Sequence, residues 1–340
     1  MVVVITGASA GVGRATAREF AIHGHCLALL ARGKTGLEAA AREVEELGGC
    51  ALVIPTDVSQ PDQVEAAVQQ IEEAHGPIDI WINNAMVSVL SPALEMELDE
   101  IRRVTDVTYL GAAYCTLAAL RRMAPRNRGT IVQVGSALAY RSIPLQSAYC
   151  AAKHALRGFT DSLRSELIHD KVDVHLTMVQ LPALNTPQFD WVKNRLPRKP
   201  QPVPPIFQPE VAARAIYWAA HHRRRELYVG LPVWKAIVGN KLFPGILDRY
   251  LGRKGYDSQQ SSEMAGLQRN NLWKPIEKDF GAHGRFEAHT RRRSASVWLS
   301  THRRALTMGA LTGLAATIVR WNLMPSSSAP APTVLLRRSS

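Results

Sequence analysis

A tyrosine and a lysine spaced one helical turn apart are the side chains of this sequence best suited to chemistry. Tyr149 and Lys153 are separated by Cys-Ala-Ala, and Ser136 lies shortly before them. Because residues i and i+4 share one face of a helix, the Lys153 ammonium group can stabilise a phenolate at Tyr149 and lower its pKa from about 10. A serine hydroxyl can hold a carbonyl oxygen, so the set could exchange a proton with an alcohol. An isolated Tyr-x-x-x-Lys pattern more often reflects aromatic packing, so the rest of the chain must decide.

A glycine-rich loop follows directly after the first apolar run, Val2 to Ile5. The loop residues of interest are Thr6, Gly7, Ser9, Gly11, Val12 and Gly13. Glycines between a strand and a helix allow backbone N–H groups to approach a phosphate, and the positive end of the helix favours the anion. The alternative is a tight turn that serves helix packing only.

The elements that must position these residues alternate between short β-branched runs and longer amphipathic stretches. We expect strands at Val2–Thr6, Cys26–Ala31, Ala51–Thr56, Ile78–Ile82, Gly129–Val134 and Val172–Val179, and a short one at 227–229. Helices are expected at 12–24, 34–48, 60–75, 97–124, 147–169 and 209–220. This alternation predicts an α/β fold with a doubly wound parallel sheet and helices on both faces.

The glycine loop, the serine and the Tyr-x-x-x-Lys pair, in this order, resemble the short-chain dehydrogenase/reductase family of classical type over residues 1 to about 235. The resemblance implies a Rossmann fold in which Ser136 orients a substrate carbonyl, Tyr149 is the general acid or base, and Lys153 lowers its pKa and binds the nicotinamide ribose. It also implies cofactor contacts from Asp57 and Val58 after the third strand, from Asn84 and Ala85 after the fourth, and from Thr186 after the sixth. Asp57 could instead be a helix N-cap.

Three positions depart from the family pattern. Met86 and Ala183 each stand where the family has a glycine, beside Asn84–Ala85 and before Thr186 respectively. Thr108 stands where the family has an asparagine that holds a water in the proton relay. A threonine can bond a backbone carbonyl and bend a helix, but it cannot donate an amide hydrogen. We therefore expect Thr108 to alter the relay.

The residues after the second strand indicate which nicotinamide dinucleotide binds. An NAD site usually has an acidic residue there, whereas this chain has Arg32, with Lys34 nearby. An arginine can pair with the 2′-phosphate of NADP, and Ser9 could add a hydrogen bond. We therefore expect NADP(H) to be favoured, with NAD(H) possible. The alternative is that Arg32 belongs to a solvated basic loop.

A proline-rich stretch at about 186–209 corresponds to the variable substrate lid of the family. Phe189, Trp191 and Phe207 in this stretch could line an apolar pocket or could simply pack the lid.

The charge of the chain is concentrated in its second half. Residues 1–190 carry 16 Lys and Arg against 21 Asp and Glu, and residues 191–340 carry 25 against 8. We expect residues 236–340 to be a basic, partly disordered extension, whose arginine clusters are either solvated or drawn to anionic lipid. Its apolar segment 305–319 is short for a membrane span; it could lie on a bilayer surface or dock on the protein itself.

Several further expectations concern the setting of the protein. The four cysteines have no metal-type spacing, so we expect reduced thiols, no metal site and a cytoplasmic location, with a location peripheral to a membrane as the alternative. We see no N-terminal leader pattern. We expect a homo-oligomer, a small-molecule carbonyl or alcohol as substrate, and no nucleic-acid partner.

Together these features predict an NADP(H)-dependent oxidoreductase that interconverts a carbonyl and an alcohol by hydride transfer. The alternative is a catalytically weakened, cofactor-binding scaffold or regulatory protein that acts through its basic arm.

Overall fold

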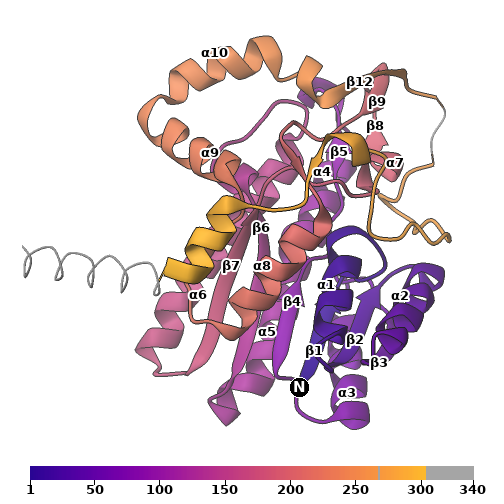
Figure 1. Ribbon diagram of the computed structural model, residues 1–340, viewed down its shortest axis with the longest axis vertical. Helices are drawn as coiled ribbons and strands as arrows, with labels where there is room; N and C mark the ends of the chain where they lie inside the picture. Colours follow the sequence, from indigo (N-terminus) through magenta and orange to yellow (C-terminus); the bar gives the residue numbers. More distant parts are fainter. Residues whose placement is uncertain (267–268, 304–340) are drawn as a thin grey trace, which may run out of the picture. The chain divides into compact units, whose positions relative to one another are not determined.

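Seven parallel strands form the central sheet of the computed structural model, which describes residues 1–266 and 269–303 (Figure 1). In spatial order they are β11 (Glu226–Tyr228), β7 (Val174–Leu181), β6 (Gly129–Ser136), β4 (Ile80–Asn83), β1 (Val2–Thr6), β2 (Cys26–Ala31) and β3 (Cys50–Pro55). The chain reverses its direction of travel across the sheet between β1 and β4. Ligands of open α/β sheets bind outside the carboxyl ends of the strands at such a point.

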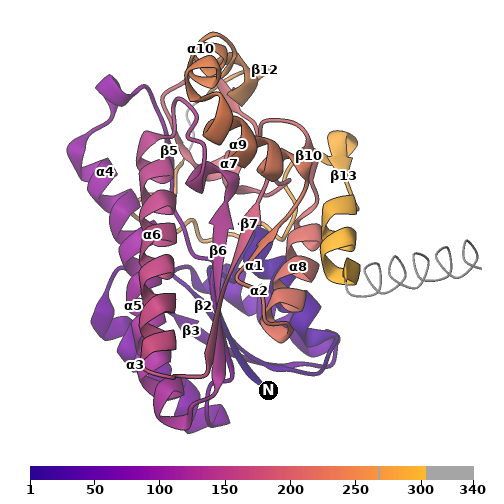
Figure 2. The same cartoon turned by 90° about the vertical axis from the view of Figure 1, so that its left-hand side faces the viewer.

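Helices cover both faces of this sheet (Figure 2). The larger ones are α1 (Gly11–Ala21), α2 (Lys34–Glu46), α3 (Pro61–His75), α4 (Leu98–Thr105), α5 (Gly111–Met123), α6 (Ser147–His169), α8 (Pro209–His221), α9 (Leu231–Leu242) and α10 (Pro244–Lys254). The short helical elements are α7 (Gln188–Trp191) and the π-helical turn η2 (Asp106–Leu110). Five 3₁₀ turns are η1 (Ala93–Glu95), η3 (Ala124–Arg126), η4 (Ala137–Ala139), η5 (Asp257–Gln259) and η6 (Glu287–His289). The short strands are β5 (Val89–Leu90), β8 (Lys193–Asn194), β9 (Arg198–Pro200), β10 (Ile206–Phe207), β12 (Gln260–Met264) and β13 (Thr290–Arg291).

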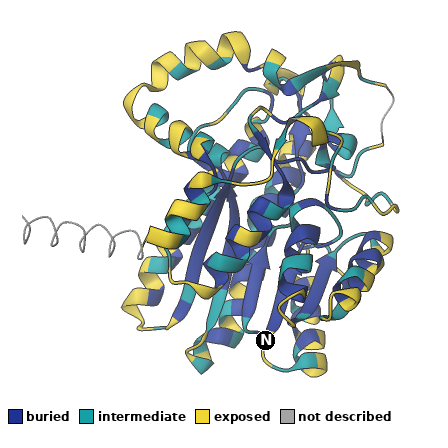
Figure 3. Cartoon of the chain, viewed as in Figure 1, coloured by how far each residue is buried: buried dark blue, intermediate teal, exposed yellow. Residues whose placement is uncertain are grey.

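The central strands are buried on both sides, which explains their continuous apolar sequence (Figure 3). In β1, Val2 and Val4 pack into the cluster that contains residues of α3, α5 and α6. The alternate residues, Val3 and Ile5, pack into the cluster with residues of α1, α2 and α8. This alternation confirms the predicted doubly wound α/β architecture.

The prediction of one continuous helix over 97–124 is wrong. The structure divides it into α4, the π-helical turn η2 and α5. Thr108 lies in η2, where its side chain is occupied by another segment of the chain, as described below.

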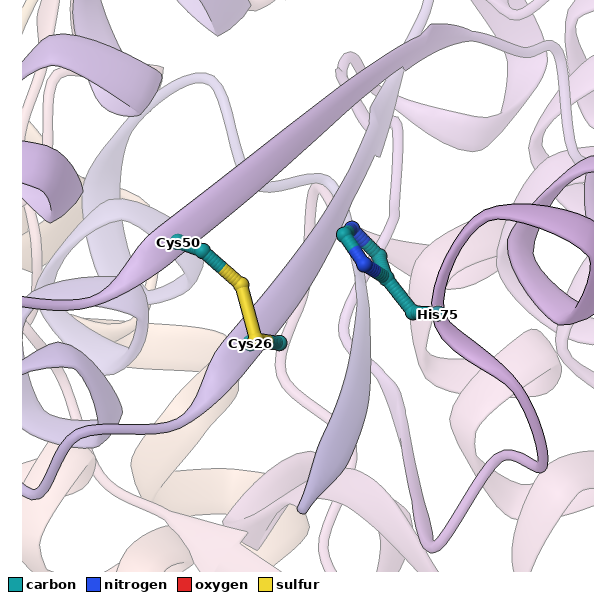
Figure 4. Close-up of side chains that lie close together, drawn as sticks. All are labelled: Cys26, Cys50 and His75. Atoms are coloured by element: carbon teal, nitrogen blue, oxygen red, sulfur yellow. A yellow bond between two sulfur atoms is a disulfide. The ribbon is translucent and has the colours of Figure 1, made fainter.

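Two of the four cysteines are joined by a disulfide, which corrects the expectation of reduced thiols. Cys26 of β2 and Cys50 of β3 are register partners with a Cα–Cα distance of 4.5 Å, and their sulfurs are bonded (Figure 4). Cys115 and Cys150 are free and buried. His75 lies beside the disulfide, and its ring nitrogen and the two sulfurs lie within 4.8 Å of one another. Because the two sulfurs are bonded to each other, neither is the thiolate that a metal would require.

The first compact unit runs from Met1 to Val297, well beyond the boundary expected near residue 235. Its later part contains α9, α10 and a largely irregular segment, residues 269–286, which we call the C-terminal strap. The second unit begins at Trp298. The apolar segment 305–319 lies outside the described residues. Within the described part of the chain, no helix is long and apolar enough to cross a membrane.

Candidate active site

A cavity of about 570 Å³ lies at the carboxyl ends of the central strands. It is lined by most of the residues that the sequence singles out: Gly7, Ser9, Gly11, Val12, Arg32, Asp57, Val58, Asn84, Ala85, Ser136, Tyr149, Lys153 and Thr186. Thr6, Gly13 and Thr108 are not among the lining residues. The cavity therefore joins the glycine loop to the Ser-Tyr-Lys set.

The Ser-Tyr-Lys set occupies one wall of the cavity. Ser136 ends β6, and its Oγ accepts a 3.1 Å hydrogen bond from the N–H of Leu138. Tyr149 and Lys153 lie on α6, with the Lys153 Nζ 5.7 Å from the centre of the Tyr149 ring. The hydroxyl proton of Ser136 thus remains for Tyr149 or for a substrate oxygen.

Burial controls the protonation of this set. It raises the pKa of Tyr149 above its ordinary value, while a hydrogen bond with the Ser136 side chain acts in the opposite direction. Burial also lowers the pKa of Lys153 to about 8. The Nζ of Lys153 donates a 2.8 Å hydrogen bond to the carbonyl oxygen of Val134. Burial therefore weakens the charged form of Lys153, which lies close to the tyrosine whose phenolate it would stabilise.

Thr6 and Asn84 hold the glycine loop in place. The Thr6 hydroxyl accepts hydrogen bonds from the N–H groups of Asn84 and Ala85, at 2.9 and 3.0 Å. The Asn84 side-chain amide in turn donates to the carbonyls of Thr6 and Gly7. A Cβ on Gly13 would lie 2.1 Å from the Gly7 carbonyl oxygen, so this contact requires glycine. Thr6, Gly13 and the Asn84 amide thus fix the shape of the loop.

Thr108 uses its hydroxyl to hold the segment that follows β4. Its Oγ1 accepts a 3.1 Å hydrogen bond from the Val87 N–H and donates a 2.9 Å bond to the Val87 carbonyl. Thr108 is fully buried and the cavity does not reach it. Thr108, which we expect at the position of the family asparagine, therefore holds the backbone of Val87.

The C-terminal strap lies against the glycine loop, which sequence reasoning did not anticipate. The Gly11 N–H donates a 3.0 Å hydrogen bond to the carbonyl oxygen of Gly281. At the other end of the strap, Leu272 is fully buried in the main core cluster. Strap residues Asn271, Pro275, Ile276, Lys278 and Phe280 line the cavity. The strap therefore forms one wall of the expected dinucleotide site.

Arg32 lines the cavity, but the strap also engages its side chain. The guanidinium group donates hydrogen bonds to the carbonyl oxygens of Asn271, Leu272 and Trp273. Burial lowers the pKa of Arg32, and the neighbouring Arg103 acts in the same direction. The solvated-loop interpretation is therefore wrong for this side chain.

Asp57 has a partner that the sequence did not indicate. Its Oδ2 accepts a 2.6 Å bond from Arg103, and its Oδ1 accepts from the N–H and hydroxyl of Ser59. Burial acts to raise the pKa of Asp57, but the bonds from Arg103 and Ser59 outweigh it and hold the pKa below its usual value. Arg103 also donates to the Leu272 carbonyl, so Asp57 is coupled to the strap.

Much of the remaining lining of the cavity is apolar. Phe189 and Trp191 of the predicted lid line it, whereas Phe207 is buried in the core instead. Further lining residues come from α9 and α10, among them Ala236, Leu247, Tyr250 and Leu251. These two helices lie beyond the region of family resemblance, and their weak patterning gave no indication that they would reach the site.

Known proteins resemble this chain in sequence. The family model described as short chain dehydrogenase matches residues 1–194. The uncharacterized oxidoreductase YxnA of Bacillus subtilis is 30% identical over 322 residues, covering 94% of this chain and 89% of that protein. Human dehydrogenase/reductase SDR family member 7 is 40% identical over 171 residues, about half of each chain.

A solved structure shows the same arrangement of elements. An alcohol dehydrogenase from Thermococcus sibiricus, complexed with 5-hydroxy-NADP, superposes with a TM-score of 0.58 at 29% identity. The match covers 67% of this chain and 95% of that one. The chain therefore belongs to the short-chain dehydrogenase/reductase family.

Proposed function

We propose that this oxidoreductase interconverts a small-molecule carbonyl compound and an alcohol, with NADP(H) as its preferred cofactor. The observation that carries the proposal is the shared cavity: Ser136, Tyr149 and Lys153 line the same space as the glycine loop. The residues proposed to move the proton and the loop proposed to bind phosphate thus border the same cavity.

The residues of the chain suit a dinucleotide. Helix α1 begins at Gly11 with no side-chain cap and with no acidic residue in its first turn, as expected for a helix end that binds a phosphate. The N–H of Gly11 itself is bonded to the Gly281 carbonyl, so the phosphate contacts would come from the neighbouring N–H groups of the loop. Gly7 and Gly11 have φ values of +67° and +57°, which favour glycine and let the backbone come close. Ser9, Val12, Val58, Ala85 and Thr186 would complete the contacts.

The preference for NADP(H) is supported by the charges around the ribose end of the cavity. No acidic residue follows β2, and Arg32 lines the cavity beside the Asp57–Arg103 pair. A guanidinium there would favour a 2′-phosphate. The Thermococcus sibiricus structure contains an NADP derivative. NAD(H) remains the alternative that the cofactor assay addresses.

The chain's own residues account for the proton and the orientation of the substrate. When bound, the nicotinamide group supplies or accepts the hydride. Ser136 holds the carbonyl oxygen by turning its hydroxyl proton from Tyr149 to the substrate, and Tyr149 gives that oxygen a proton during reduction or takes one during oxidation. Lys153 stabilises the phenolate that Tyr149 becomes after it has lost its proton.

The test is a panel of aldehydes and ketones assayed with NADPH and with NADH, followed by loss of nicotinamide absorbance and by identification of the alcohol product. We expect turnover with at least one carbonyl class and a preference for NADPH. Tyr109→Phe is the matched control for Tyr149→Phe, because Tyr109 is partly buried in the same core cluster but does not line the cavity. Tight nucleotide binding without turnover on any carbonyl would favour the scaffold interpretation instead.

A further inference from the structure

Helices α9 and α10 form a hairpin whose outer side carries a continuous stripe of exposed apolar residues. We call this stripe the hairpin face; it consists of Leu231, Trp234, Val238, Leu242, Phe243, Ile246 and Tyr250, all of them exposed. Leu242, Phe243 and Ile246, at the turn between the helices, are each about 60% exposed. The spacing of three and four residues places the exposed ones along one side of each helix, and in α9 further apolar residues lie on the other sides as well. Trp234 packs its ring against that of Tyr228 of β11, with 4.8 Å between the ring centres, and the seven side chains remain 42–63% exposed.

The same hairpin is basic. Residues 231–254 contain five cationic side chains, Lys235, Lys241, Arg249, Arg253 and Lys254, and a single acidic one, Asp248. Asp248 is already paired with Arg141 at 2.6 Å. The cations therefore dominate the charge around the hairpin face.

The inner side of the hairpin is anchored beside the catalytic residues. Arg141, in the loop after β6, donates to the side chains of Asn240 of α9 and Asp248 of α10. Past the end of α10, the buried Gln259 donates to the Pro144 carbonyl and accepts from Gln146, shortly before Tyr149. These bonds tie both helices to the segment that leads into α6.

The hairpin also joins the surface to the cavity. Ala236, Leu247 and Leu251 line the cavity, and Tyr250 both lines it and belongs to the hairpin face. Figures 1 and 2 both show α9 and α10 beyond the carboxyl ends of the strands, where the cavity lies. An apolar molecule at the hairpin face would therefore stand at the mouth of the site.

We propose that the hairpin face docks on the surface of an anionic lipid bilayer and admits membrane-dissolved, lipophilic carbonyl compounds to the cavity. An apolar stripe with Trp and Tyr, flanked by Lys and Arg, has the composition of a helix that lies in the bilayer interface. A second copy of this chain fits less well, because a contact through the same face would bring two basic hairpins together. The proposal that the protein docks on a membrane is based on the exposed hairpin face and its charge. Only the proposed substrate class rests on the proposed function.

The docking test is binding of the full-length protein to vesicles of phosphatidylcholine with and without phosphatidylserine. We expect co-sedimentation with the anionic vesicles, and its loss at about 0.5 M NaCl because salt screens the cationic side chains. The double variant Phe243→Ser/Ile246→Ser should weaken binding roughly tenfold or more, because two apolar side chains can no longer be buried. Lys241→Glu/Arg253→Glu should also weaken vesicle binding, because two cationic side chains that attract anionic lipid become acidic.

Two controls make the result specific to the hairpin. Ile168→Ser alters an even more exposed apolar residue, on the last turn of α6, and should leave vesicle binding unchanged. The chain has seven Trp residues, so the difference between wild type and Trp234→Phe isolates the contribution of Trp234 to fluorescence. We expect brominated lipids to quench that contribution.

A substrate arm separates docking from catalysis. Because Phe243 and Ile246 do not line the cavity, their double variant should keep the wild-type kcat/KM for a short, water-soluble carbonyl, but should show a raised KM for a long-chain carbonyl presented in anionic vesicles. If the enzyme reduces no carbonyl at all, the proposed function fails while vesicle binding still reports on docking.

Three results would overturn the docking proposal. One is that the full-length protein ignores anionic vesicles at low salt. Another is that brominated lipids leave the Trp234 fluorescence unchanged, even if another part of the chain binds the vesicles. The third is a protein dimer, detected by sedimentation, that Phe243→Ser/Ile246→Ser dissociates, because the hairpin face would then be covered by a second copy.

Discussion

The backbone N–H of Gly11 donates a 3.0 Å hydrogen bond to the carbonyl oxygen of Gly281. This bond connects the loop expected to bind phosphate with a strap far along the chain, outside the region matched by the family model. Together with the burial of Leu272 in the main core, it makes the strap part of the folded unit that contains the active site.

The strap should therefore contribute to global stability. We expect Leu272→Ala to lower the free energy of unfolding by about 2–5 kcal/mol, as for other fully buried leucines. Leu94→Ala is the control, because Leu94 is fully exposed and its loss should change stability by less than about 0.5 kcal/mol. Denaturant unfolding measures both. Equal stabilities of the two variants would contradict the assignment of the strap to the core.

Arg32 should distinguish the two nicotinamide dinucleotides. Because a guanidinium can pair with the 2′-phosphate, Arg32→Ala should lower the ratio of NADPH to NADH affinity by roughly tenfold, the loss of one charge-assisted contact. Lys34→Ala is the matched control, since Lys34 is mostly exposed and pairs with Glu38. Fluorescence titration gives both affinities. A parallel loss of NADPH and NADH affinity would show that Arg32 acts by holding the strap and does not read the phosphate.

Lys153 should make stability depend on pH. Its pKa is lowered from 10.5 to about 8 in the folded protein, so below pH 8 folding buries a charged group at a cost on the order of 3 kcal/mol. Because the unfolded chain binds more protons between pH 8 and 10.5, the cost disappears as the pH rises through that range. Lys153→Met should therefore be more stable than the wild type by a margin that shrinks from pH 8 to 10.5. The free energy of unfolding of both proteins is measured by denaturant at each pH. A difference between the two proteins that stays constant from pH 8 to 10.5 would contradict the lowered pKa.

A count of free thiols tests the disulfide between Cys26 and Cys50. Titration of the unfolded protein with a thiol reagent should find two reactive thiols without reductant, from Cys115 and Cys150, and four after reduction. Cys26→Ser/Cys50→Ser should give two under both conditions. Four thiols in the unreduced wild type would restore the sequence-based expectation.

The sequence predicted most of the fold because its strands are buried on both faces. Val2–Thr6 and Cys26–Ala31 read as uninterrupted apolar runs and form β1 and β2 at those bounds. The break between α4 and α5 was missed because η2 preserves the apolar pattern of a continuous helix. Within η2, Thr108 bonds the backbone of Val87, and no local pattern encodes that contact.

The site was predictable only where its chemistry is local in sequence. The glycine loop and the Tyr149–Lys153 pair each lie within a few residues, and the cavity does join them. The pairing of Cys26 with Cys50 depends on strand register, and the Arg103–Asp57 pair joins two separate elements. The strap has an irregular sequence, and the spacing of the apolar residues in α9 and α10 does not say where these helices pack, so only the folded structure places them at the cavity.

The most direct test of the central claim is the turnover of Tyr149→Phe beside its affinity for NADPH. The substitution keeps the ring and its packing but removes the hydroxyl that would give its proton to the carbonyl oxygen. We predict near-normal NADPH affinity and a fall in kcat of ~10²–10⁴, the range contributed by general acid catalysis, whereas Tyr109→Phe should keep the wild-type rate. Wild-type kcat in Tyr149→Phe with NADPH bound normally would show that Tyr149 is not the proton donor and would contradict the account.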